Sequence, residues 1–202
     1  MVTATTGLWL AVGVLGALLI GGLAAGFLLL AMGRLHLDLG WGRSLHELGP
    51  IELEIAAPRE LVFKLISEPY LGHTPEDSKI EVLARGVDLA VAAHLTKVHF
   101  YEARTVEVIE FEAPARVGFR HLTGPVPYAV EQFVLREAEG GSTLRYSGEM
   151  GIDFFLLGRI AARYWVRPQW ERVVRKDLED VKERAEELER HRRPRRSGEP
   201  AA

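Results

Sequence analysis

Two ionisable side chains, His121 and Glu131, are the best candidates for chemistry in this chain, because each falls within the apolar pattern of a predicted strand. The turn Gly124-Pro125 separates the two strands. In an antiparallel pair joined at that turn, residues whose numbers sum to about 250 lie opposite each other. Phe119 is then opposite Glu131, and His121 is opposite Ala129.

A second turn, Gly140-Gly141, defines the next register. Residues whose numbers sum to about 279 should pair there, which places Phe133 beside Tyr146 and Leu135 beside Leu144. These pairs extend one apolar face of the sheet, which should point into the core. That face comprises Val117, Phe119, Phe133, Leu135, Leu144 and Tyr146.

The same registers carry His121 and Glu131 inward. Burying an ionisable group is costly unless it is partnered, and a diagonal His–Glu pair would satisfy both residues. Such a pair suits either an anchor for a ligand head group or a proton-transfer pair. Alternatively, His121 lies at a wet strand end with Glu131 at the mouth of a cavity, or the register is slipped by one residue, which reverses every assignment.

Strands and helices must position these residues. Alternation over 51–55 predicts a strand, and Pro58 begins a helical pattern that should stop before Pro69. Further alternating segments, separated by turn residues, predict a meander of antiparallel strands. They are Ile80–Arg85, Leu89–Lys97, Phe100–Glu112, Ala115–Leu122, Tyr128–Glu137 and Ser142–Asp153.

The C-terminal part predicts a long helix. Phe154–Val166 is strongly apolar, and beyond Pro168 apolar residues recur at helical spacing opposite charged ones. Pro168 should kink or restart the helix. Because this helix has one sheet to cover, the sheet must curl around it. The predicted fold class is therefore α+β, a helix-grip in which a curved antiparallel sheet wraps a long C-terminal helix.

Two segments resemble a known superfamily. The run Ile51–Pro69, with its Ala57-Pro58 link between strand and helix, is similar to the opening of START/Bet v 1-like (SRPBCC) proteins, including the polyketide cyclase/dehydrase and lipid-transport group. Phe133–Met150 is similar to the penultimate hairpin of that group. The resemblance covers about Pro50–Leu188. It implies a cavity for an apolar ligand such as a lipid, sterol or polyketide, and it implies chemistry only in some members.

The N-terminal stretch Met1–Gly33 contains no charged side chain. As a helix it is long enough to cross a hydrocarbon core of about 30 Å. A signal peptide would need an early basic residue and a shorter apolar core, and a buried soluble helix would need a larger protein around it. Arg34 and Arg43 follow the span and none precedes it, which predicts a cytoplasmic domain.

We therefore expect a transmembrane anchor over 1–33, a juxtamembrane linker over 34–49, a START/Bet v 1-like domain over 50–190 and a basic disordered tail over 191–202. The linker is either a plain connection or a segment that lies at the membrane interface. Gly22 and Gly26 form a Gly-x-x-x-Gly pair that permits weak self-association of the span. The basic tail could contact an anionic leaflet.

Composition excludes several functions. The chain has 25 Lys and Arg against 28 Asp and Glu, a formal charge of −3, so nucleic acid is not expected as a partner. There is no cysteine, no metal-ligand spacing and no nucleotide or acyl-transfer motif, so neither a metal nor a cofactor is expected.

Two functions are left, beside the possibility of a scaffold whose cavity is collapsed. The first is a membrane-anchored module that binds or transports an apolar ligand; the second is a cyclase/dehydrase-type enzyme acting in the same cavity. Catalytic residues stay unassigned. The candidate cavity residues are Phe119, His121, Glu131, Phe133, Tyr146 and Trp165.

Overall fold

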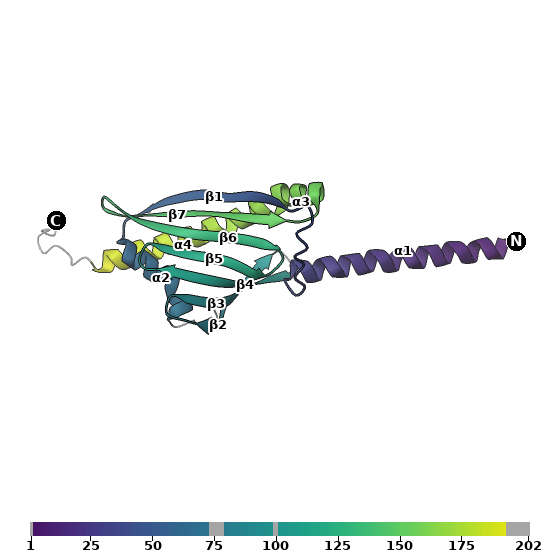
Figure 1. Cartoon of the computed structure of the whole chain (residues 1–202), viewed down its shortest axis with the longest axis horizontal. Coiled ribbons are helices and arrows are strands. Elements are labelled where there is room, and N and C mark those ends of the chain that lie inside the picture. The colour runs from purple at the N-terminus through teal and green to yellow at the C-terminus, as the bar shows by residue number, and fades with distance from the viewer. Residues whose placement is uncertain (1, 73–78, 99–100, 193–202) are drawn as a thin grey trace, which may run out of the picture.

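The computed structural model describes residues 2–72, 79–98 and 101–192, and it contains one sheet with helices at both ends of the chain (Figure 1). The helices are α1 (Val2–Ala31), α2 (Arg59–Leu71), α3 (Phe155–Ala161), the π-helical turn η1 (Ala162–Val166) and α4 (Arg167–Arg192). The strands are β1 (Ser44–Ile55), β2 (Ile80–Arg85), β3 (Leu89–Val98), β4 (Tyr101–Glu112), β5 (Arg116–Thr123), β6 (Tyr128–Ala138) and β7 (Gly141–Ile152).

The seven strands form one antiparallel sheet in the order β1-β7-β6-β5-β4-β3-β2. The six strands expected after the first helix agree with β2–β7 to within about one residue at each end. Three of the expected pairings are also confirmed, whereas His121 and Ala129 lie just beyond the last β5–β6 pair, Arg120 with Val130. Phe119 pairs with Glu131, Phe133 with Tyr146, and Leu135 with Leu144.

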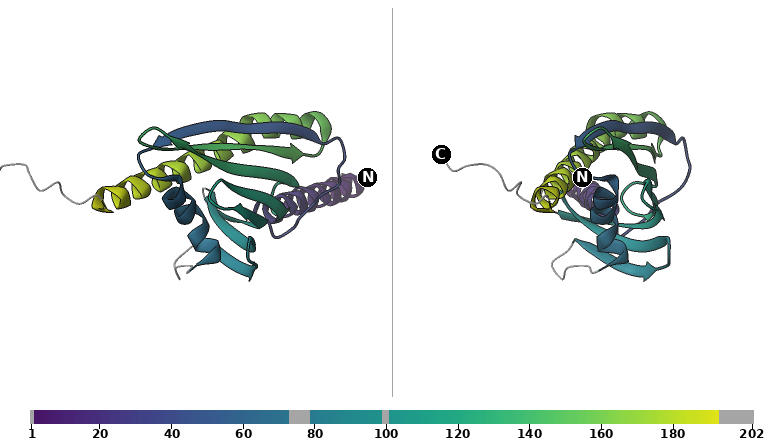
Figure 2. Two further views of the ribbon diagram at one scale, coloured as in Figure 1. Left: turned by 60° about the vertical axis from the view of Figure 1, so that its left-hand side comes forward. Right: turned by 90° about the vertical axis from the view of Figure 1, so that its left-hand side faces the viewer.

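The sheet curves around α4, and α2 covers another part of the same face (Figure 2). Strand alternation places one row of side chains from each strand on this concave face. The rows from β4–β7 include Ile109, Val117, Leu135 and Leu144, all at most 2% exposed. The architecture is therefore the predicted α+β arrangement of a curled sheet around a C-terminal helix.

Helix α2 differs from the prediction at its end. It was expected to stop before Pro69, but it continues through Pro69 to Leu71. A proline in the last turn removes at most one hydrogen bond of the helix, and burial of Ile66 and Tyr70 holds that turn on the sheet.

The C-terminal helix is interrupted where Pro168 predicts a break. The π-helical turn η1 ends at Val166, and α4 begins again at Arg167 with Pro168 in its first turn, where a missing N–H costs little. Val174, Leu178 and Ala185 form the buried stripe of α4. The apolar segment before the break was expected to cover the sheet, yet most of its large side chains are exposed.

Strand β1 begins at Ser44, inside the stretch expected to be a linker. Its pairing with β7 shifts between Leu48 and Ile51, where Gly49 adopts a φ of +77°. The alternation is interrupted there, so sequence periodicity shows only the second half of the strand.

Residues 32–43 are attached to the domain rather than extended from it. The Asp153 carboxylate, 2% exposed, accepts hydrogen bonds from the N–H groups of Leu39 and Gly40, both at 3.0 Å, and from Arg43 Nε at 2.8 Å. The contact with Arg43 lowers the pKa of Asp153, and the two backbone donors act in the same direction. Asp38 on the surface also contacts Arg43.

Helix α1 meets the same end of the domain. The Arg104 N–H donates to the carbonyl of Met32 at 3.0 Å. Gly33 has a φ of +67°, and a Cβ there would lie 1.9 Å from the Arg104 carbonyl oxygen, so this close approach requires glycine. His36 Nδ1 lies 3.2 Å from the carbonyl oxygen of Gly124.

The α1 segment Gly7–Ala31 is apolar and long enough to cross a membrane, and none of it is buried against the domain. Figure 1 shows it extending away from the sheet. The predicted tail falls largely on residues 193–202, outside the described residues; its first two residues, His191 and Arg192, end α4.

We predict that Asp153→Ala lowers the free energy of unfolding by about 2–3 kcal/mol, because it leaves Arg43 and two backbone donors without their acceptor. Urea denaturation of the full chain in detergent micelles, followed by circular dichroism, measures this loss. Asp38→Ala is the matched control: it removes an exposed acid from the same arginine and should cost less than about 1 kcal/mol. Equal effects of the two substitutions would contradict the assignment.

Candidate functional site

His121 lies on the concave face of β5 between two glutamates from the neighbouring strands. Its Nε2 atom is 3.0 Å from Glu107 Oε1 on β4 and 3.6 Å from Glu131 Oε1 on β6. The side chains of His121, Glu107 and Glu131 are only 4%, 7% and 10% exposed. The structure therefore buries an imidazole between two carboxyl groups, and the expected His121–Glu131 pair is present.

Glu131 has two further partners. The Tyr146 hydroxyl on β7 donates a hydrogen bond to Glu131 Oε2, and Trp170 Nε1 on α4 donates to the same oxygen at 2.8 Å. The Trp170 indole also stacks on His121, with ring centroids 5.1 Å apart and an interplanar angle of 25°. Trp170 thus connects α4 to the polar residues of the sheet.

Glu107 extends the cluster in the other direction. Its Oε2 atom is 3.3 Å from His94 Nδ1 on β3, and His94 Nε2 is 3.1 Å from the Tyr70 hydroxyl on α2. We call the set His94, Glu107, His121, Glu131, Tyr146 and Trp170 the polar cluster. Its members lie on β3, β4, β5, β6, β7 and α4, so five neighbouring strands and the C-terminal helix position it.

Burial and charge oppose each other in this cluster. Burial disfavours the His121 imidazolium, but contacts with Glu107 and Glu131 outweigh it and raise the pKa of His121 to about 9. Burial also disfavours the Glu107 carboxylate, but His121 and His94 lower its pKa to about 2. Burial, reinforced by Glu131, raises the pKa of Tyr146. At neutral pH the site therefore holds a cationic imidazole and a neutral tyrosine.

Neither ring nitrogen of His121 makes a hydrogen bond within the described residues, although Nε2 lies within ion-pair distance of both glutamates. Among the described residues, Nδ1 has no hydrogen-bond partner although it is buried. A protonated imidazole carries N–H donors on both nitrogens. A buried donor without a partner costs about 1–3 kcal/mol, and such groups need an explanation such as a bound ligand.

Aromatic rings fill the face beside the polar cluster. The ring centroids of Phe133 and Phe119 are 5.4 Å apart in an edge-on contact, and those of Phe133 and Tyr146 are 5.5 Å apart. The ring centroids of Tyr70 and Phe119 are 6.0 Å apart. These rings occupy the space in which the sequence predicts a cavity. The polar cluster and the aromatic rings are adjacent because their residues occupy successive inward-facing positions of the same strands.

Of the six predicted cavity residues, five come together. Phe119, His121, Glu131, Phe133 and Tyr146 share the concave face, as the registers require. Trp165 does not: it is 76% exposed on η1. The π-helical turn directs Trp165 outward, and Trp170, one turn into α4, occupies the interior instead.

Three members of the polar cluster, His94, Glu107 and Trp170, are not among the six predicted cavity residues. Pairing across the turn Ala113-Pro114 could have found Glu107, because numbers that sum to about 228 lie opposite each other there. The structure pairs Glu107 with His121 directly.

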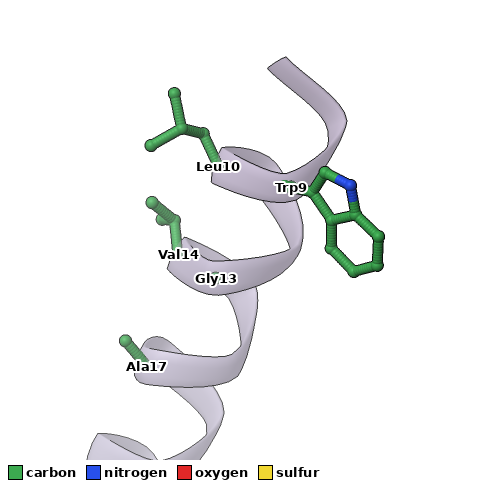
Figure 3. A pocket seen from close by; sticks show the side chains of 5 residues that line it. All are labelled: Trp9, Leu10, Gly13, Val14 and Ala17. Carbon is green, nitrogen blue, oxygen red and sulfur yellow. The ribbon is translucent and has the colours of Figure 1, made fainter. Parts of the chain in front are cut away.

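A hollow at the surface lies elsewhere, along α1. Figure 3 shows that it is lined by Trp9, Leu10, Gly13, Val14 and Ala17. In a bilayer, acyl chains would fill such a groove. Within the described residues, no group of three or more His, Cys, Asp or Glu side chains is arranged to hold a metal ion.

Comparison with known proteins shows the fold. No family model and no curated protein matches the chain. Among solved structures, the Zhui aromatase/cyclase from Streptomyces sp. R1128 is 19% identical, covers 75% of this chain and 97% of its own, and has a TM-score of 0.52. The architecture that the two structures share is a helix-grip fold.

Other helix-grip structures match similarly. TTHA0849 from Thermus thermophilus is 20% identical, covers 71% of this chain and 94% of its own, and has a TM-score of 0.50. SA2116 from Staphylococcus aureus, described as a protein of unknown function, is 12% identical, covers 74% and 98%, and also has a TM-score of 0.50. At such identities these likenesses establish the fold alone.

We predict that the His121 imidazole titrates near pH 9 and that Glu107→Gln lowers its pKa, because one of the two carboxyl groups that favour its charged form is lost. NMR of the full chain with labelled histidine in micelles measures both values. His46, whose pKa burial and Arg167 lower, is the internal control and should not respond. A wild-type His121 that titrates near its ordinary 6.5 would contradict the buried pair.

The same shifts predict how stability depends on pH. The folded-state pKa of His121 is raised, so its contribution is complete below about pH 6.5 and is lost as pH rises through about 9. The folded-state pKa of Glu107 is lowered, so its contribution is present above about pH 4.5 and is lost as pH falls toward about 2. Urea titrations should show less stability at pH 9 than at pH 6.5, and Glu107→Gln should reduce that difference.

Proposed function

We propose that this protein is a membrane-tethered module that binds an apolar ligand between its sheet and α4, with the ligand's polar end held by the polar cluster. The observation that carries the proposal is the buried, unpartnered Nδ1 of His121 beside a row of aromatic rings. An apolar interior with a few convergent polar groups is the composition typical of small-molecule sites.

The charges in the cluster indicate the kind of head group. His121 is cationic and offers a donor, but two carboxyl groups flank it. An anionic head group would meet both glutamates, so a carboxylate or phosphate is disfavoured. A neutral acceptor, such as a ketone or hydroxyl oxygen, can take the Nδ1–H hydrogen bond without that repulsion.

The location of the cluster suits a ligand taken from a bilayer. His121 lies two residues before Thr123, the end of β5, and the following turn contacts His36 after α1. At about 3.3 Å per residue, the imidazole is about 7 Å from the end of the sheet where α1 joins. If α1 crosses the membrane, with the domain on the cytoplasmic side as Arg34 and Arg43 favour, the distance from lipid to site is short.

Trp170 is the side chain that a ligand must displace. It stacks on His121, donates a hydrogen bond to Glu131 and is itself partly exposed. The π-helical turn before α4 ends four residues earlier, and such turns are common at functional sites. Movement of this part of α4 would uncover Nδ1.

A second candidate function follows from the acid–base character of the cluster. A cationic imidazole can polarise a ketone oxygen while a neighbouring glutamate removes a proton from the adjacent carbon. These are the two roles that ring closure of a polyketone requires, with loss of water afterwards. The aromatase/cyclase named above shares this fold, so that chemistry is the one to test.

We predict that the full chain binds pentadecan-2-one about tenfold more tightly than pentadecanoic acid or pentadecane, because only the ketone offers a neutral acceptor to His121. Native mass spectrometry of the protein in detergent measures the three probes, which have the same chain length. The same instrument identifies molecules that co-purify with the protein.

The matched variants are His121→Gln and His46→Gln. The first removes the cation from the interior and should abolish the preference for the ketone, whereas the second changes a histidine on β1 outside the cluster and should leave it intact. Equal binding of all three probes to the wild type, or no binding of any, would refute the proposed ligand site.

For the enzymatic candidate we expect orcinol to form from heptane-2,4,6-trione, because ring closure of this triketone and loss of one water give that product. Liquid chromatography follows the conversion. Glu131→Gln should abolish turnover while ketone binding persists. Ketone binding without conversion of the triketone would support the binding function and contradict the enzymatic one.

A further inference from the structure

The segment between β7 and α4 exposes an unusual amount of apolar surface. Leu157 is 75% exposed and Trp165 is 76% exposed. We call this set the α3 surface: Phe154, Phe155, Leu156, Leu157, Ile160, Tyr164 and Trp165, all at least 45% exposed. Contiguous apolar patches of this kind mark interaction sites, whereas singly scattered residues do not.

The backbone holds the α3 surface in place. Phe154 and Phe155 have φ values of 75° and 51°, a region that bulky residues rarely adopt. Their N–H groups donate to the carbonyls of Trp41 at 2.8 Å and Gly42 at 3.1 Å, and the Trp41 ring meets Phe155 edge-on at 5.6 Å. Strain of this kind persists where the surroundings impose it, often at functional sites.

The exposed charged side chains of this segment are all basic. Arg159 and Arg163 are exposed on α3 and η1, and Arg163 lies over the Tyr164 ring at 5.7 Å. The segment 153–167 contains a single acidic residue, Asp153, and its side chain is buried against Arg43. An apolar surface with Trp, Tyr and Phe that is interspersed with arginines is typical of a segment lying in a membrane interface.

The position of the α3 surface agrees with this chemistry. Figures 1 and 2 show α3 at the end of the domain from which α1 extends. Hydrogen bonds fix both elements there: Met32 at the end of α1 bonds to Arg104, and Trp41 bonds to Phe154. A bilayer containing α1 would therefore face the same end of the sheet as α3.

We propose that the α3 surface is a second membrane contact, which inserts its apolar side chains into the interfacial region of the leaflet next to the end of α1. Arg159 and Arg163 bind anionic lipid head groups beside it. This contact rests on the proposed anchoring by α1, and together with the fixed end of α1 it sets the orientation of the domain on the bilayer.

The chain has no cysteine, so single-cysteine variants can report the environment of chosen positions. We would label Leu157→Cys with the fluorophore NBD in the full chain, reconstituted in nanodiscs of phosphatidylcholine with or without one quarter phosphatidylglycerol. Val87→Cys, at a position 96% exposed between β2 and β3, is the aqueous control. Leu19→Cys in α1 reports whether the anchor is inserted.

We expect blue-shifted emission at Leu157 and Leu19 and not at Val87. A lipid-like signal at Leu19 with an aqueous signal at Leu157 would overturn the second contact and leave the anchor intact. An aqueous signal at both positions would overturn the anchor and, with it, this inference. A signal at Leu157 that depends on the number of protein copies per disc would assign the surface to a second copy and reject the lipid.

The arginines provide an independent measurement. Arg159→Gln and Arg163→Gln should each lower the ratio of docked to undocked protein about fivefold in anionic discs, because each basic residue near such a surface contributes about that factor. Arg175→Gln and Arg184→Gln, exposed on α4, are the matched controls and should not change the ratio. Equal effects of both pairs would overturn the role of Arg159 and Arg163.

Discussion

The interior of this domain depends on a positive imidazole held between two buried glutamates. Removing charges from water costs several kcal/mol for each ion, and only close contact between opposite charges compensates that cost. His121, Glu107 and Glu131 come from three adjacent strands, β4 to β6. A slip of β5 by one residue would turn His121 outward and leave two acids buried without a cation. The ion pair therefore restricts the register of the central sheet.

The same contacts extend this restriction to the helices. Trp170 and Tyr146 both donate to Glu131, and Tyr70 reaches Glu107 through His94, so α4 and α2 are placed by polar contacts as well as by packing. Hydrophobic residues of similar volume often stabilise a core as well as or better than a buried ion triad. Stability alone is therefore a weak reason for this cluster. The unpartnered Nδ1 of His121 favours recognition of a ligand instead.

Much of this arrangement could be predicted from the sequence because it follows from short-range rules. Turns at Gly124-Pro125 and Gly140-Gly141 are local, and strand pairing extends outward from them, so Phe119, Glu131, Phe133 and Tyr146 could be assigned to one face. Glu107 needed only the same reasoning at the preceding turn. Trp165 could not be placed in this way, because a π-helical turn changes the face on which later residues lie.

The α3 surface was unpredictable for a different reason. Apolar composition indicates that a segment avoids water, but it does not distinguish a protein core from a bilayer. The hydrogen bonds to Asp153 fix residues 39–43 against the end of β7, and the adjoining hydrogen bonds from Phe154 and Phe155 direct α3 away from the core. These contacts, rather than composition, leave the segment exposed. The end of α1, the α3 surface and the turn after β5 are thereby held at one end of the sheet. With α1 in a membrane, the polar cluster would be kept at a constant short distance from the lipid. A flexible linker could raise the local concentration of the domain at the membrane, but it could not hold the site in one orientation toward it.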